Sequence, residues 1–139
     1  MNVKLISCES EVDAIVPIMN ELRPQYSEEQ LKLKIVNLMD HGYKIAYAHD
    51  GINVMSVGGF VFRENLALGK HVYLDDLVTN GRIRSQGAGK TLLNWIMRHA
   101  KTQGCTHISL DSHVTRFEAH RFYLREGFHI VGHHFEKAL

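Results

Sequence analysis

The chain has 139 residues, 45% hydrophobic and 22% charged, which is typical of one globular domain and excludes a disordered chain. The net charge is +1 and no basic block stands out, so neither observation supports a nucleic-acid partner. The two cysteines, Cys8 and Cys105, argue against a disulfide scaffold and against a Cys-x-x-Cys zinc site. No secretory signal and no apolar run of about 18 residues is present, so we expect a cytoplasmic protein without a membrane partner.

The first third of the chain predicts one strand and two helices. The apolar run at 3–6 fits a strand, and apolar residues then recur at helical spacing over about 10–22. Pro17 either kinks this helix or moves its start to a later residue, because proline removes a backbone donor. A second helix, at 28–41, begins with a capping box at Ser27.

After residue 42 the apolar period changes from about 3.6 to 2, which predicts consecutive strands. The expected strands are 43–48, 53–62 and 71–79, with a loop at 63–70 between the last two. Asp50-Gly51 supplies the first turn, since Asp-Gly is a strong hairpin signal. Gly58-Gly59 inside the second strand indicates a bulge or the close approach of another backbone.

The last part of the chain alternates between helix and strand. Helices are expected at 87–103 and 116–126, and strands at 107–111, 128–131 and 133–137. Gly104 and Gly127 follow the two helices, a position where glycine commonly terminates a helix. The resulting order, β-α-α-β-β-β-α-β-α-β-β, predicts one mixed α/β, α+β-like domain over residues 1–139.

A glycine-bearing turn lies between the predicted strand at 71–79 and the predicted helix at 87–103. Its residues are Arg84, Ser85, Gln86, Gly87, Ala88, Gly89, Lys90 and Thr91. A turn of this kind at a helix N-terminus presents backbone N–H groups to a phosphate, and the helix dipole favours the anion. The alternative is a helix start that binds no ligand.

Two phosphate-binding patterns compete for this turn. The nucleoside triphosphate loop G-x-x-x-x-G-K-[ST] matches at its Gly-Lys-Thr end, but Arg84 stands where its first glycine is required. The pattern Arg/Gln-x-x-Gly-x-Gly/Ala matches in full from Arg84 to Gly89. In this second pattern the chain resembles the GNAT acyl-CoA N-acyltransferase superfamily, in which the loop binds the pyrophosphate of acetyl-CoA.

A second stretch strengthens the resemblance. Ala119, Tyr123 and the pair Gly127-Phe128 match the family's Ala-x-x-x-Tyr segment and its helix-ending Gly-Phe. The resemblance implies the GNAT fold, with a central mixed sheet of six to seven strands flanked by about four helices, and acetyl-CoA as co-substrate. It also implies that Tyr123 protonates the departing thiolate and that Ala119 and Phe122 contact the cofactor. The alternative role for Tyr123 is that of a core aromatic residue.

The resemblance also assigns roles to the strand at 71–79. In the family this strand is bulged and splays from the next strand, which frees backbone groups to hold the pantetheine and the carbonyl. These groups belong to Leu77, Val78 and Thr79. Asp75 and Asp76 lie on opposite faces of the strand, so one of them should attract or deprotonate the acceptor ammonium. Asp76 is preferred as the catalytic residue, because it matches an acidic position of the related branch; the alternative is that both are surface carboxylates.

Other polar side chains are candidates for the acceptor pocket. Asp111 and His113 follow from the end of the next strand, and His113 or His134 remains an alternative base. Further candidates for the lining are Arg23, Tyr26, Tyr43 and Arg63. The role of Arg116 stays open, since the family often has asparagine there. No metal site is expected, because the adjacent His133 and His134 face opposite sides of a strand and cannot share an ion.

These features predict an acetyl-CoA-dependent N-acetyltransferase that acetylates a primary amine of a small molecule by direct attack in a ternary complex. The alternatives are a non-catalytic acyl-CoA-binding sensor or interaction module, an enzyme that acetylates a protein amine, and a P-loop enzyme. Residues 116–128 and the tail at 134–139 look most similar to the aminoalkylphosphonate N-acetyltransferase branch. Exposed strand edges would permit a homodimer.

Overall fold

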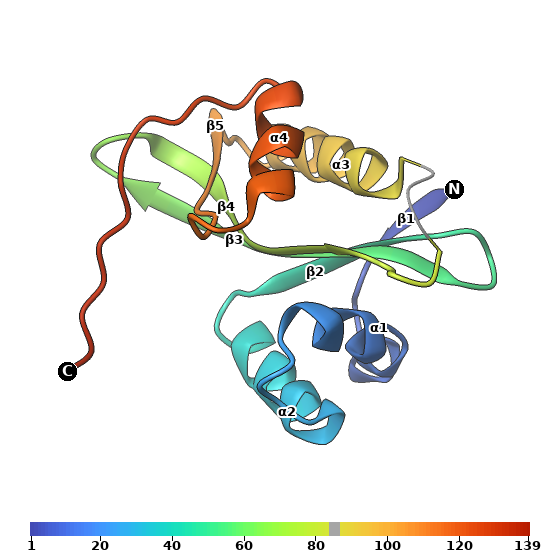
Figure 1. The fold of residues 1–139 in the computed structure, drawn as a ribbon. Coiled ribbons are helices and arrows are strands. Elements are labelled where there is room, and N and C mark those ends of the chain that lie inside the picture. Colours follow the sequence, from blue (N-terminus) through green and yellow to red (C-terminus); the bar gives the residue numbers. More distant parts are fainter. Residues whose placement is uncertain (84–86) are drawn as a thin grey trace. The chain divides into compact units, whose positions relative to one another are not determined.

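The computed structural model describes residues 1–83 and 87–139, which divide into two compact units, Met1–Ser109 and Leu110–Leu139. Along the chain (Figure 1) the described elements are β1 (Asn2–Leu5), α1 (Glu9–Leu22), α2 (Glu28–Met39), β2 (Lys44–His49), β3 (Val54–Asn65), β4 (Gly69–Thr79), α3 (Ala88–Thr102), β5 (His107–Leu110) and α4 (Phe117–Arg125). No described helix is both long and apolar enough to cross a membrane.

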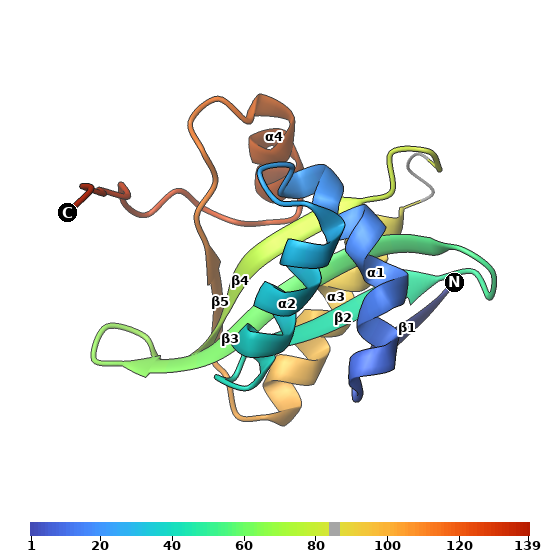
Figure 2. The same cartoon turned by 90° about the horizontal axis from the view of Figure 1, so that it is seen from below.

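The first unit is built around one sheet. Its strands follow the order β1-β2-β3-β4-β5, and each of the first three is antiparallel to the next. Helices α1 and α2 cover one face of the sheet and α3 covers the other (Figure 1, Figure 2). The predicted mixed α/β class is confirmed, although the sheet has five strands among the described residues instead of six or seven.

The two strands predicted at 128–131 and 133–137 do not form, so that prediction is wrong. Residues 128–139 take no part in a strand, and their large apolar side chains are exposed, with Ile130 at 78% and Phe135 at 90%. An extended apolar run becomes a strand only where a neighbour satisfies its backbone N–H and C=O groups. The sequence pattern identified residues with strand-like spacing without identifying a pairing partner.

Both N-terminal helices are present where the apolar spacing predicts them. α1 has Cys8 as its N-cap and continues through Pro17 without a break. Pro17 is exposed, so the helical carbonyl that its ring leaves without a partner can bond to water. The capping box of α2 is confirmed, because the Gln30 N–H donates to Ser27 Oγ (3.1 Å) and the Ser27 N–H donates to Gln30 Oε1 (3.0 Å).

Strands β3 and β4 extend further than predicted. They run to Asn65 and from Gly69, so the expected loop at 63–70 shrinks to 66–68. Asn65 Oδ1 accepts the N–H of Leu68 at 2.8 Å and closes this short turn. The extra pairs involve polar residues, which an apolar pattern does not reveal.

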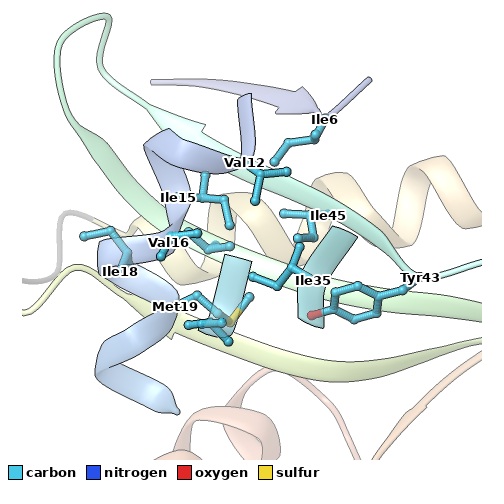
Figure 3. Close-up of a cluster of buried hydrophobic side chains, with 11 residues drawn as sticks. Ile6, Val12, Ile15, Val16, Ile18, Met19, Ile35, Tyr43 and Ile45 are labelled. Atoms are coloured by element: carbon cyan, nitrogen blue, oxygen red, sulfur yellow. The ribbon is translucent and has the colours of Figure 1, made fainter. Parts of the chain in front are cut away.

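The main core of the first unit lies between the sheet and the helices α1 and α2, with Tyr43 at one end of the cluster (Figure 3). α1 contributes Val12, Ile15, Val16 and Met19, which share one helical face. On the opposite side of the sheet, α3 buries Leu92, Leu93, Ile96 and Ala100. Full burial of one large aliphatic side chain stabilises a fold by about 1.5–3 kcal/mol, so both layers anchor the sheet.

The predicted bulge at Gly58-Gly59 is confirmed, and the extra residue lies on β4. Pairing between β3 and β4 steps from Gly59 opposite Asp76 to Phe60 opposite Leu74, which leaves Asp75 without a partner. A side chain at Gly59 would overlap the phenol of Tyr43, so glycine is required for this close approach. The bulge therefore turns one acidic residue of β4 out of the regular ladder.

Candidate active site

A pocket of about 250 Å³ opens beside the bulge, within the first unit. It is lined by Arg23, Leu38, His41, Tyr43, Val61, Asp75 and Asp76. Arg23 directly follows α1, Leu38 lies at the end of α2, and His41 and Tyr43 lie between α2 and β2. Val61 belongs to β3, and the two aspartates belong to β4. Two of the residues suggested for the lining from the sequence, Arg23 and Tyr43, do line it. Tyr26 and Arg63 are not among its described lining residues.

Arg23 and Asp76 form an ion pair in the lining of this pocket. The Nε and Nη2 atoms of Arg23 donate to the same oxygen, Oδ1 of Asp76, at 2.9 and 2.7 Å. Nη2 also reaches the backbone carbonyl of Asp75 at 3.3 Å. The Asp76 side chain is only 12% exposed, so the pair is shielded on the carboxylate side. Charge-assisted contacts of this kind hold a carboxylate firmly in one orientation.

The second oxygen of Asp76 is held by Tyr43. The phenol donates to Oδ2 at 2.5 Å. Burial raises the pKa of Tyr43 well above its ordinary value, and the charge of Asp76 raises it further. The phenol therefore stays protonated and remains a hydrogen-bond donor. With both oxygens held by described donors, Asp76 is poorly suited to exchange a proton with a substrate.

Asp75 has a different environment. No described side chain hydrogen-bonds to its carboxylate, which faces the pocket as the extra residue of the bulge. The side chain is exposed, but neighbouring protein atoms displace part of its hydration, and this raises the pKa of Asp75. The adjacent charge of Asp76 raises the pKa further, against opposing effects of Arg63 and Arg23. A carboxylate of raised pKa is a better proton acceptor than an ordinary one.

The remaining wall of the pocket is partly apolar. Leu38 and Val61 line it together with His41. The Nδ1 atom of His41 donates to the carbonyl of Asn37 at 2.8 Å, so this ring nitrogen is already engaged. The pocket thus combines one accessible carboxylate with an apolar surface.

The predicted cofactor turn lies at the start of α3. Arg84, Ser85 and Gln86 lie outside the described residues. Gly87 is the N-cap of α3 and has a left-handed backbone, with φ 74°. The N–H groups of Ala88 and Gly89 lie in the first turn, where the helix itself supplies no acceptor. This is the geometry expected for binding an anion at a helix N-terminus.

Contacts with β3 fix the start of this helix. The hydroxyl of Ser56, which is fully buried, donates to the carbonyl of Ala88 at 3.0 Å. Ala88 is itself buried, and Thr91 donates its N–H to the carbonyl of Gly87 at 2.9 Å. The first turn of α3 is therefore anchored to the sheet while Lys90 is exposed. No sequence pattern indicated the contact between Ser56 and Ala88.

The loop that precedes the turn is also anchored. The Asn80 side chain donates to the carbonyl of Val54 at 2.9 Å and accepts the N–H of Arg82 at 3.0 Å. The N–H of Gly81 donates to the carboxylate of Glu21, the penultimate residue of α1, at 3.0 Å. Sequence reasoning missed Asn80 and Glu21 as structural residues; the only signal was the Asn-Gly turn.

The backbone groups expected to hold pantetheine are partly engaged. Leu77, Val78 and Thr79 pair with Gly58, Val57 and Ser56 of β3. In an antiparallel pair, backbone groups point alternately to the partner strand and to the opposite edge. Only the groups on the opposite edge of β4 are therefore available for a ligand.

The second unit contains α4 and the predicted acid. Ala119 and Tyr123 are four residues apart and share one face of α4. The Tyr123 ring packs edge-on against Phe122 and Phe128, with centroids 5.4 and 5.5 Å away. Burial raises the pKa of Tyr123, and Arg116 partly opposes this rise. A phenol in this environment is protonated at neutral pH and able to donate.

The other suggested acceptor residues belong to this unit. His113 Nδ1 lies 2.8 Å from Thr115 Oγ1 and accepts the Thr115 N–H at 3.2 Å, so it stabilises its own loop. The Oδ1 atom of Asp111 lies 3.5 Å from Nδ1 of His134. Within residues 1–83 and 87–139, no group of three histidine, cysteine, aspartate or glutamate side chains is arranged to hold a metal ion.

Comparisons with known proteins agree with one another. The family model described as Acetyltransferase (GNAT) family matches residues 12–128. An uncharacterized N-acetyltransferase of Bacillus subtilis (strain 168) is 30% identical over 139 residues, covering 99% of this chain and 98% of the relative. An aminoalkylphosphonate N-acetyltransferase of Salmonella typhimurium is 38% identical over 66 residues, which are 48% of this chain and 43% of the relative.

A solved structure shows the same fold. An aminoglycoside N-acetyltransferase in complex with CoA superposes with a TM-score of 0.84 and covers 99% of this chain and 93% of that chain. Its sequence is 14% identical, so the likeness concerns the fold alone.

Proposed function

The chain belongs to the GNAT family of acetyltransferases, and on that premise we propose that it transfers an acetyl group from acetyl-CoA to a primary amine of a small molecule. The observation that carries this proposal is the bulge in β4, which leaves the Asp75 carboxylate facing a pocket. An ammonium group binds such a carboxylate, and the amine must lose a proton before it can attack a thioester. The aminoalkylphosphonate relative, whose named substrate is a small amine, supports the same substrate class.

At the acceptor end, we assign proton exchange to Asp75. Its raised pKa and its lack of described hydrogen-bond donors suit it to accept the ammonium proton, directly or through one water. The sequence-based preference for Asp76 as the catalytic carboxylate stays a prediction. The contacts of Asp76 with Arg23 and Tyr43 favour a role in shaping the pocket around Asp75.

At the cofactor end, the pyrophosphate of acetyl-CoA binds the turn at 84–91, and the N-terminus of α3 supplies backbone donors and a favourable dipole. The left-handed Gly87 and the anchored first turn fit this use. The backbone groups at 77–79 that point away from β3 hold the pantetheine arm and the thioester carbonyl. Ala119 and Phe122 contact the cofactor from α4.

The reaction balances with these groups. The amine nitrogen, after its proton has passed to Asp75 and then to solvent, attacks the thioester carbonyl and forms the C–N bond. The C–S bond breaks, and Tyr123 donates its phenolic proton to the departing thiolate. The nitrogen, now bonded to the acetyl carbon, releases its second proton to solvent, and Tyr123 is reprotonated from solvent. The products are the acetylated amine and free CoA, formed by direct attack in a ternary complex without an acetyl-enzyme.

Thiol release from acetyl-CoA with a panel of small amines tests the proposal. We expect Tyr123→Phe and Asp75→Asn each to lower kcat about 100-fold or more, the range typical of lost acid–base catalysis. Glu29→Gln, which removes an exposed carboxylate from the first turn of α2, is the matched control and should retain full activity. Full turnover by Tyr123→Phe would falsify the assigned acid.

The cofactor site has its own test. Gly87→Glu places a negative charge beside the pyrophosphate, and Gly87→Asn is the control, because asparagine tolerates the left-handed backbone. Calorimetry should show a large loss of CoA affinity for the glutamate variant and a small loss for the asparagine variant.

If CoA binds normally to the wild type but no amine accelerates thiol release, the acyl-CoA sensor replaces the enzyme. Kinetics of the ping-pong type would contradict direct attack.

A further inference from the structure

Resting on the acetyl transfer proposed above, we propose that the acceptor is a small alkylamine without an anionic group, whose single positive charge is the reacting ammonium. The pocket beside the bulge carries this inference through its charge arrangement. Among its described lining residues, the charged ones are the cation Arg23 and the anions Asp75 and Asp76. These three charges sum to −1, which favours a cationic ligand.

Arg23, the cation among the described lining residues, is already paired with a carboxylate. Two of the guanidinium nitrogens of Arg23 donate to Asp76 at 2.9 and 2.7 Å, and one of them also reaches the carbonyl of Asp75. To pair with these two nitrogens, a carboxylate or phosphonate of the acceptor would have to displace Asp76 from Arg23. Asp76 would then be a largely buried carboxylate that has lost its counter-ion, which is strongly unfavourable.

Tyr43 strengthens this restriction. Its phenol donates to the other oxygen of Asp76 and is confined by the backbone of Gly59. Asp76 therefore cannot turn away without breaking a second hydrogen bond. The ion pair is a fixed part of the wall, and Asp75 is the one lining carboxylate without a described hydrogen-bond donor on its side chain.

The rest of the lining is suited to the uncharged alkyl part of an amine. Leu38 and Val61 supply apolar surface, and Nδ1 of His41 is occupied by the Asn37 carbonyl. The volume of about 250 Å³ lies below the roughly 300–1,000 Å³ of pockets for drug-sized ligands. A short alkyl chain fits both the chemistry and the size.

Matched acceptors test this selectivity. Butylamine and 4-aminobutyrate share one carbon skeleton and differ by the carboxylate, and propylamine with 3-aminopropylphosphonate is a second pair. We expect kcat/KM, measured by thiol release, to be at least tenfold higher for the uncharged member of each pair. Equal or greater kcat/KM for the anionic member would overturn the inference and leave the proposed acetyl transfer intact.

A specificity change provides an independent test. Asp76→Asn keeps the shape of the side chain but frees the Arg23 guanidinium, so the preference for butylamine over 4-aminobutyrate should fall at least tenfold. Glu29→Gln, the exposed control, should keep the wild-type ratio. An unchanged ratio in a folded Asp76→Asn protein would overturn the role given to the ion pair.

Direct binding separates the two proposals. Isothermal calorimetry of the wild-type protein with butylamine and 4-aminobutyrate should show at least tenfold tighter binding of butylamine. If this preference is found and no amine supports thiol release, the pocket selectivity holds and the enzymatic proposal fails. If neither binding nor turnover distinguishes the pair, the selectivity fails.

Discussion

Glu21 accepts a hydrogen bond from the backbone N–H of Gly81, at 3.0 Å from Oε2. Two residues further along the chain, Arg23 binds Asp76 in the pocket. The end of α1 therefore contacts both the wall of the acceptor pocket and the loop that leads to the proposed cofactor turn.

We expect Glu21→Ala to raise the KM for acetyl-CoA about two- to tenfold, because a lost hydrogen bond of about 0.5–1.5 kcal/mol loosens the loop at 80–83. The contact is exposed, which keeps the effect modest. Steady-state kinetics with saturating amine measures it. Glu21→Gln keeps an acceptor oxygen and should stay near the wild-type KM. An equal rise in both variants would point to the charge of Glu21 instead of the hydrogen bond.

Gly59→Ala should destabilise the protein by about 1–3 kcal/mol and abolish most activity, since the new methyl group overlaps the Tyr43 phenol. Tyr43 would then have to release Asp76. Gly58→Ala is the matched control, because its methyl group meets the flexible end of Ile96, at 2.8 Å, instead of a held ring. Urea unfolding checks both. In the double variant Gly59→Ala/Tyr43→Ala, the loss of unfolding free energy should be smaller than the sum of the losses in the two single variants. Strict additivity would contradict the overlap between the new methyl group and the phenol.

Tyr43 should make stability fall at alkaline pH. Its pKa is raised well above the ordinary value in the folded state, so the folded protein keeps a proton that the unfolded chain releases near pH 10. This contribution is fully present below about pH 10 and is lost as pH rises through the folded-state pKa. Urea unfolding between about pH 9 and 11 should show a steeper decline for the wild type than for Tyr43→Phe. Parallel declines would disprove the assignment.

Glu11 should contribute stability that is lost in acid. A hydrogen bond from Lys4, followed by the Ser7 backbone N–H, lowers the pKa of Glu11 to about 2 from 4.5. The contribution is present above pH 4.5 and disappears as pH falls through about 2. The stability difference between wild type and Glu11→Gln should therefore shrink over this interval. Glu9→Gln, which removes the neighbouring exposed charge, should show a smaller change.

The sequence by itself determined the features that depend on local geometry. The apolar spacing of α1 and α3, the Ser27 capping box and the Gly58-Gly59 bulge all follow from the periods and dihedral preferences of short segments. The two family motifs were likewise sufficient to identify an acetyltransferase. Each of these signals lies within a few residues of chain, so no tertiary contact is needed to recognise it.

Only the tertiary structure decided which acidic residue of β4 has a carboxylate that is not held by described hydrogen-bond donors. Arg23 and Tyr43 reach Asp76 across 53 and 33 residues of sequence, and no local pattern specifies such a contact. The same limit explains the tail at 128–139, whose apolar spacing predicted strands that have no pairing partner. Strand pairing and side-chain neutralisation depend on what the rest of the chain places nearby, because both require a partner distant in sequence.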